Sequence, residues 1–316
     1  MDPLRKSALP TQQRPLQRPH KPFKVNGLAV HGWLALCLGL AAQTALAQLA
    51  YREVSVPSLE QVQGQALQQR GFWFALPAAA TGDRPRAAVV LLHGCGGPYG
   101  RGGQLTVRMR DYAALLNGWG LQVLVTDSLS PRGEQELCTQ ALGSRRVTQV
   151  HRRQDALGAL QWLAAQPGVD PRRLGLIGWS HGGSAVLTSL DLSQPMVRDA
   201  PVKPAFAVAF YPGCADSLRR GWLTSAPLLL LVGAADDWTP AAPCEALALS
   251  AGPAVNLQTF PDAHHGFDSL VPVRLRPDVP NGVHPGRGVH VGGQPAARDA
   301  ALVSLQQFLR EQAATD

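Results

Sequence analysis

Ser180 lies in the run Gly178-Trp-Ser-His-Gly182, the strongest chemical signal in the sequence. Glycines two residues before and after a serine are typical of a sharp turn from a strand into a helix, because larger side chains would collide there. Such a turn exposes the hydroxyl as a nucleophile. The motif alone is weak evidence, but the apolar run 173–178 precedes it and a stretch of small residues follows.

A serine nucleophile needs a base to take its proton, and the base needs a carboxylate to orient it. The sequence offers Asp236 or Asp237 directly after one apolar run, and His264 or His265 directly after another. The order serine, acid, histidine, each after a predicted strand, favours acyl-transfer chemistry.

Acyl transfer also needs backbone donors for the charge that develops on the substrate oxygen. The run His93-Gly-Cys-Gly-Gly97 follows a buried apolar strand, where such a donor is expected. We therefore predict an oxyanion hole formed by the N–H groups of Cys95 and His181. The imidazole of His181 is expected to point away from the Ser180 hydroxyl and to serve as packing or pocket wall.

The elements that position these residues alternate along the chain. Apolar runs predict strands at 71–76, 87–92, 121–126, 173–178, 205–210, 227–232 and 254–260; helical spacing predicts helices at 105–117, 149–165, from 181, at 241–250 and at 296–311. Continuous apolar strands that alternate with helices indicate one α/β domain over 48–316. Its sheet should be mostly parallel and doubly wound, with helices on both faces.

Residues 271–295 differ from this pattern, with five prolines and five glycines and no period. A loop of this length in a compact domain is often a lid or a binding loop, and it can also be a surface excursion; the sequence leaves both open. His284 and His290 lie in it, but two histidines in such a loop are not expected to bind metal. No metal site is predicted.

The charge of the chain is +7, which would suggest a nucleic-acid partner if it were spread over the domain. Residues 1–47 hold six bases and one acid, so 23 bases and 21 acids remain in the rest. The basic excess lies in the leader, and we expect no nucleic-acid partner.

Residues 1–47 have the pattern of a signal peptide: a basic stretch, an apolar run from Leu28 and the small residues of Ala45-Leu-Ala47. Cleavage would leave Gln48 first. The alternative is an uncleaved membrane anchor, since the run can be stretched to about 20 residues. We expect a periplasmic or secreted protein with no membrane contact after cleavage.

Export makes the cysteines informative. Cys37 would leave with the leader, and four cysteines remain in the domain: Cys95, Cys138, Cys214 and Cys244. In an oxidising compartment they suggest two disulfides, for which three connectivities exist.

The chain resembles the dienelactone hydrolase family of α/β-hydrolases over about residues 70–312. The matching segments are His93–Gly97, Gly178–Gly182, Gly233-x-x-Asp236-x-x-Thr-Pro240 and Phe260-Pro-x-Ala-x-His265-x-Phe267. The resemblance implies the α/β-hydrolase fold, no cofactor, and Asp236 and His265 rather than their neighbours as acid and base. The namesake enzymes carry a cysteine where this chain has Ser180, so a general ester or lactone substrate is favoured over a carboxylated lactone.

The strand order of that fold also implies a disulfide pairing. Cys95 and Cys138 should lie on loops after adjacent strands. Cys214 should follow one strand, and Cys244 should begin the helix after the Asp236 loop at the end of the adjacent strand. Any other pairing must reach past the nucleophile strand. We therefore expect the bridges Cys95–Cys138 and Cys214–Cys244.

Three further residues are candidates for substrate binding. Trp179 and Trp238 could form an aromatic pocket or simply pack around the turn. Arg132 could bind a substrate carboxylate or fasten its own loop to Asp127.

Two other functions remain open at this point. A serine peptidase of the prolyl oligopeptidase type shares the order of the triad, but only about 20 residues separate Gln48 from the first expected strand, which leaves no room for a gating domain. A non-catalytic binding protein on a hydrolase scaffold is the other. The expected partner is a small ester or lactone, and the sequence does not indicate an oligomeric state.

Overall fold

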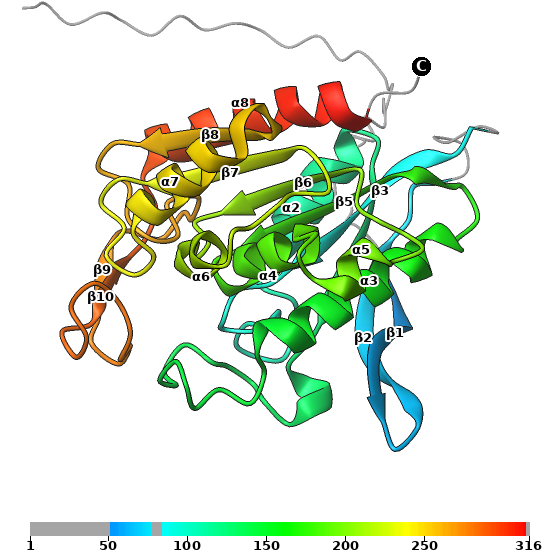
Figure 1. Ribbon diagram of the computed structural model, residues 1–316, viewed down its shortest axis with the longest axis horizontal. Helices are drawn as coiled ribbons and strands as arrows, with labels where there is room; N and C mark the ends of the chain where they lie inside the picture. The colour runs from blue at the N-terminus through cyan, green and yellow to red at the C-terminus, as the bar shows by residue number, and fades with distance from the viewer. Residues whose placement is uncertain (1–50, 78–83, 314–316) are drawn as a thin grey trace, which may run out of the picture. The chain divides into compact units, whose positions relative to one another are not determined.

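The computed structural model describes residues 51–77 and 84–313, and the predicted signal peptide lies outside them. An eight-stranded sheet forms the centre, in the order β1-β2-β4-β3-β5-β6-β7-β8 (Figure 1). The strands are β1 (Arg52–Val62), β2 (Gln65–Phe74), β3 (Arg86–Leu92), β4 (Gln122–Asp127), β5 (Val169–Trp179), β6 (Phe206–Phe210), β7 (Leu228–Gly233) and β8 (Val255–Phe260). From β4 to β8 all neighbours are parallel, which confirms the predicted sheet.

β1 and β2 form an antiparallel hairpin at one edge of the sheet, and β2 pairs antiparallel with β4. The sequence predicts only the end of β2. β1 escapes detection because it is a polar edge strand with few buried side chains. It also carries Pro57, a residue that sheets accept at edges but that argues against a central strand.

Helices cover both faces of the sheet, as predicted. α3 (Gln149–Ala164), α4 (His181–Leu190) and α7 (Ala241–Ala251) share one buried cluster, which packs on one face. α2 (Val107–Gly118) and α8 (Pro295–Ala313) share the cluster on the other face. Short helices α5 (Pro195–Arg198) and α6 (Ala215–Arg219) and the 3-10 turns η1 (Ser130–Arg132) and η2 (Gly252–Ala254) complete the connections. Among the described residues, no helix is both long and apolar enough to cross a bilayer.

Two disulfides join segments that follow adjacent strands, and Cys244 lies in the first turn of α7. Cys95 pairs with Cys138, after β3 and β4, and Cys214 pairs with Cys244, after β6 and β7. This is the pairing expected from the strand order.

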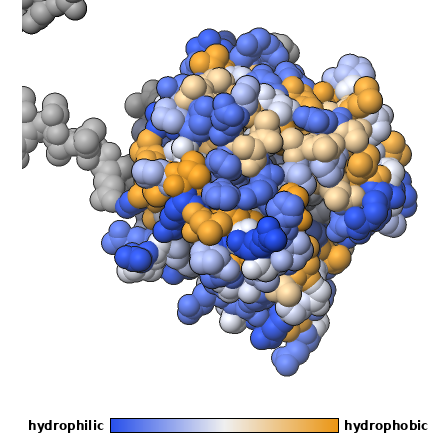
Figure 2. Space-filling view, turned by 90° about the vertical axis from the view of Figure 1, so that its left-hand side faces the viewer, coloured by the Kyte–Doolittle hydropathy of each residue, from blue (hydrophilic) through white to orange (hydrophobic). Residues whose placement is uncertain are grey.

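The region 271–295 contains a small hairpin, β9 (Arg274–Arg276) and β10 (Val289–Val291), which stands apart from the central sheet (Figure 1). Figure 2 shows the corresponding side of the molecule, where apolar patches lie among polar ones. Several apolar side chains of this part of the chain are exposed: Leu270, Val271, Val273, Leu275 and Val283. The hairpin is therefore only partly held by burial of its own side chains.

Candidate active site

Ser180 occupies a tight turn between β5 and α4. Its backbone has φ 54° and ψ −117°, a left-handed conformation that costs a non-glycine residue free energy and that clusters at functional sites. A Cβ at Gly178 would lie 2.2 Å from the carbonyl oxygen of Gly182, so only glycine fits there. The predicted turn, with its requirement for small residues, is present.

The side chains of Ser180, His265 and Asp236 form one hydrogen-bonded chain. His265 Nε2 lies 2.8 Å from Ser180 Oγ, and His265 Nδ1 lies 2.8 Å from Asp236 Oδ2. They come from loops after β5, β8 and β7, which meet at the carboxyl edge of the sheet. A nucleophile, a base and an orienting acid need this connectivity.

Asp236 is buried, and its second oxygen is held by the chain itself. The backbone N–H groups of Trp238 and Thr239 each donate to Asp236 Oδ1 at 2.8 Å. Burial opposes ionisation of this carboxyl, but His265 and these donors outweigh it and lower the pKa of Asp236 below its usual value. The group is therefore a carboxylate over the neutral pH range.

The imidazole of His265 lies between two aromatic rings. Its centroid is 4.7 Å from that of Tyr211 and 4.6 Å from that of Trp238. The hydroxyl of Tyr211 donates to buried Asp268 at 2.6 Å, and Trp179 Nε1 donates to the same carboxylate at 3.0 Å. The bonds to Asp268 fix the Tyr211 ring, which in turn packs against the imidazole.

The two backbone N–H groups predicted as oxyanion donors belong to residues near Ser180. The N–H of His181 begins α4, and Cys95 follows Gly94, whose Cβ position would be 3.6 Å from the Cβ of Ser180. Within the described ranges, neither N–H has a hydrogen-bond acceptor. Burial, with the charge of Arg152 second, lowers the pKa of the His181 imidazole well below its usual value, so this ring is neutral.

A cavity of about 760 Å³ opens beside Ser180, a volume suited to a small organic molecule. Cys95, His181, Trp238 and Thr239 form the wall next to the serine, together with Asn281, Gly282 and Val283 from the Pro/Gly-rich region. Part of the region 271–295 is thus a wall of this cavity.

The wall segment is fastened to two other loops. The Asn281 side chain donates to Gln140 O at 2.9 Å and accepts from Leu142 N at 3.0 Å. Val283 N donates to Asp237 O at 2.8 Å. The segment therefore bridges the loop that carries Cys138 and the loop that carries the acid.

The model of the dienelactone hydrolase family matches residues 76–274, more than half of the chain. The chain belongs to the dienelactone hydrolase family. The chain is also similar to an uncharacterised protein of Mycobacterium tuberculosis. The two are 27% identical over 223 residues, which cover 66% of this chain and 72% of the relative.

Solved structures of this dienelactone hydrolase fold are similar at low identity. A dienelactone hydrolase-like promiscuous phosphotriesterase, P91, from metagenomic libraries has a TM-score of 0.57 and 18% identity, over 83% of this chain and 99% of its own. Thermogutta terrifontis esterase 2, phosphorylated by paraoxon, has a TM-score of 0.58 and 18% identity, over 85% of this chain and 97% of its own. A puromycin-hydrolysing peptidase of Mycobacterium tuberculosis has a TM-score of 0.58 and 19% identity, over 88% of this chain but only 42% of its own. At these identities the likeness establishes the fold.

Two expected substrate-binding residues lie elsewhere in this hydrolase. Arg132 is engaged by Asp155, at 2.8 Å from both guanidinium NH groups, and by Glu60 of β1, so it has no charge to spare for a substrate. Its two carboxylate partners belong to segments that the sequence did not connect with it, and it fastens its own loop through Ser128 O at 2.6 Å. In the described part of the chain, Asp127 is not among its partners. Trp179 is buried against Phe210 and does not line the cavity. Trp238 does line it.

Sequence reasoning missed Thr239 and Asp268. Thr239 Oγ1 lies 3.0 Å from Asp236 Oδ2 and 3.1 Å from His265 Nδ1. Asp268 accepts two hydrogen bonds from Arg108, each at 3.0 Å, besides those from Tyr211 and Trp179. The position of Thr239, three residues after the acid, was a sequence signal for its role. Asp268 has no such signal, because its partners are distant in sequence.

Proposed function

We propose that this protein is a serine hydrolase that cleaves carboxylic esters or lactones, with Ser180 as nucleophile, His265 as general base and Asp236 as the orienting acid. The observation that carries the proposal is the continuous hydrogen-bonded chain from the Asp236 carboxylate to a serine hydroxyl that lines a cavity. Membership of a hydrolase family supports the reaction class.

In the proposed reaction, Ser180 Oγ attacks the carbonyl carbon while His265 Nε2 takes its proton. The carboxylate of Asp236 stabilises the imidazolium that forms. The N–H groups of Cys95 and His181 stabilise the oxyanion, and one such donor is typically worth about 3–4 kcal/mol of the barrier. His265 then gives the proton to the leaving alcohol, and water, activated by the same base, hydrolyses the acyl-enzyme.

The test is an activity panel of short-chain aryl esters, aliphatic esters and lactones, with a fluorophosphonate probe that labels activated serines. Ser180→Ala should lose labelling and at least about 10⁴-fold in kcat, because members of such a unit act together. A Ser180→Ala variant that keeps most of its turnover would falsify the assignment.

The neighbouring residues provide matched controls for acid and base. Asp236→Asn and His265→Ala should each lower kcat by about 10⁴-fold, whereas Asp237→Asn and His264→Ala, assayed with a chelator, should be far milder. If Asp237→Asn and His264→Ala caused the larger losses, Asp237 and His264 would be the acid and the base instead.

A peptidase is the second candidate, since one structure of the same fold is a peptidase. Fluorogenic dipeptide amides, assayed beside the esters, separate the two. We also propose export: mature protein from the periplasm or medium should begin at Gln48, and an N-terminus upstream of it would indicate an uncleaved anchor.

A further inference from the structure

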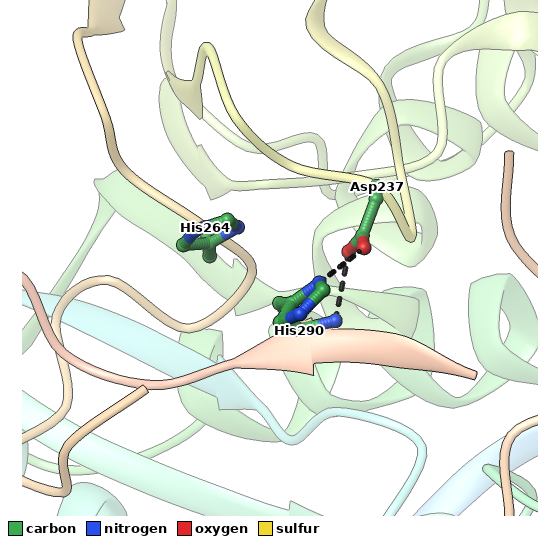
Figure 3. Close-up of side chains that lie close together, drawn as sticks. All are labelled: Asp237, His264 and His290. Atoms are coloured by element: carbon green, nitrogen blue, oxygen red, sulfur yellow. Dashed lines mark hydrogen bonds and ion pairs between the residues drawn. The ribbon is translucent and has the colours of Figure 1, made fainter. Parts of the chain in front are cut away.

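Next to the proposed acid and base lies a second cluster of polar side chains, Asp237, His264 and His290 (Figure 3). Asp237 follows the acid, His264 precedes the base, and His290 comes from β10. One donor atom from each residue lies within 4.8 Å of the other two. Three chain segments thus bring two imidazoles and a carboxylate around one space.

The carboxylate of Asp237 is already oriented by the hairpin. The backbone N–H of His290 donates to Asp237 Oδ1 at 2.9 Å, and His290 Nδ1 lies 2.7 Å from Asp237 Oδ2. His264 Nδ1, by contrast, is buried and has no hydrogen-bond partner in the described part of the chain. A buried ring nitrogen without a partner costs free energy, so His264 carries one unsatisfied hydrogen-bonding atom.

We propose that Asp237, His264 and His290 form a binding site for a divalent transition-metal ion of the zinc type. Two histidines and one carboxylate are a ligand set that zinc accepts, and three protein ligands leave a fourth position for water. Zinc holds nitrogen and oxygen at about 2.0–2.2 Å, so tetrahedral ligands lie roughly 3.4 Å apart. Donor atoms within 4.8 Å reach that spacing by small side-chain rotations.

The site joins the β9–β10 hairpin to the loops that carry the acid and the base. The hairpin already contacts both loops through Val283 N, which donates to Asp237 O, and Gly292 N, which donates to His265 O at 3.0 Å. Some apolar side chains of the segment are exposed while Val279 and Val289 are buried, so these polar contacts add to the packing that holds it in place. A metal ion at the cluster strengthens this attachment and with it the cavity wall at Asn281–Val283.

The expectation of no metal site rested on His284 and His290 as two histidines of a Pro/Gly-rich loop. The actual partners of His290 come from segments 53 and 26 positions earlier, Asp237 and His264. They become neighbours only through the fold.

The experiment uses untagged protein stripped with a chelator. Zn²⁺ is titrated by calorimetry, and Co²⁺ is titrated by the visible absorption that reports its coordination. We expect one equivalent per chain and a melting temperature that rises by several degrees on Zn²⁺ addition, because a ligand of the native state stabilises it.

His264→Ala and His290→Ala should each weaken Zn²⁺ binding by more than about 100-fold, since loss of a partner that only supports a ligand already costs about 10–100-fold. His284→Ala, an exposed histidine of the same region, should bind as the unchanged protein does. Melting temperatures of the metal-free variants check folding. His290 is half exposed on the hairpin, so its replacement is the less disruptive of the two for the fold. Binding that survives in His290→Ala, or the absence of any stoichiometric binding, overturns the proposal. Repeating the titration in Ser180→Ala separates this result from the fate of the proposed hydrolase activity.

Discussion

The side-chain amide of Asn281 lies 2.9 Å from the carbonyl oxygen of Gln140, 141 positions earlier in the chain. Its oxygen accepts a second hydrogen bond from Leu142 N. One side chain thus ties the Pro/Gly-rich region to the loop that follows the Cys95–Cys138 disulfide, and both segments line the cavity. The width of the cavity on this side depends on that contact.

Asn281→Ala should therefore raise KM for a preferred ester about 3–10-fold with little change in kcat. Two hydrogen bonds of about 1 kcal/mol each are lost at the wall and none at the reacting atoms. Steady-state kinetics measure this, with Asn256→Ala, an exposed amide on β8, as control. A fall in kcat at constant KM would place Asn281 in the catalytic machinery instead.

Thr239 positions the acid and base through its hydroxyl. Thr239→Val keeps the shape and removes the oxygen that lies 3.0 Å from Asp236 Oδ2, so kcat should fall by about 10-fold, in line with the loss of one hydrogen bond to a charged group. Thr239→Ser retains the hydroxyl and should stay near the unchanged enzyme. If Thr239→Val keeps its activity while Thr239→Ser loses it, packing of the methyl group and not the hydroxyl is what matters.

The two disulfides close loops of similar length, with sequence separations of 43 and 30, and should stabilise the protein by about 3–4 kcal/mol each on the chain-entropy model. Replacing Cys95 and Cys138 by alanine should also lower kcat by about 10-fold, because it loosens the loop that offers an oxyanion donor. Replacing Cys214 and Cys244 is the matched control: a similar drop in the free energy of unfolding, with kcat nearly kept. Equal kcat values in the two pairs would mean that the Cys95–Cys138 bridge does not position the oxyanion donor.

The buried histidines predict a loss of stability in mild acid. Burial, reinforced by the charge of Arg152, lowers the pKa values of His93 and His181 well below the ordinary 6.5. Below the ordinary pKa, the unfolded chain binds protons that the folded chain does not. The contribution of the two neutral histidines to the free energy of unfolding is therefore complete above about pH 7. It declines below pH 6.5 by about 1.4 kcal/mol per pH unit for each ring.

Urea unfolding of the unchanged protein between pH 7.5 and 5.5 measures that slope. The slope of the free energy of unfolding against pH measures how many more protons the unfolded chain binds. His181→Gln should lower that number by about one, whatever its effect on stability at pH 7.5. His284→Gln, at an exposed position, should leave the slope unchanged. An unchanged slope in His181→Gln would mean that this ring is protonated in the folded state.

The sequence predicts the parallel sheet and the chemistry at its edge because these depend on local properties. Strand β5 is a continuous apolar run, and the glycines beside Ser180 are required by a turn of only a few residues. Asp236 and His265 follow directly after the strands that carry them. The resemblance to the family distinguished them from Asp237 and His264, and their hydrogen bonds agree with that choice.

Contacts between distant segments are what the tertiary structure alone decides. Arg132 appeared free to bind a substrate until folding placed Glu60, 72 positions away, and Asp155 beside its guanidinium. His290 appeared isolated until the hairpin carried it to Asp237. Periodicity and motif spacing describe neighbours along the chain, whereas the partner of a charged side chain is whichever group the packed elements bring within about 4 Å of it, and burial makes that pairing strong.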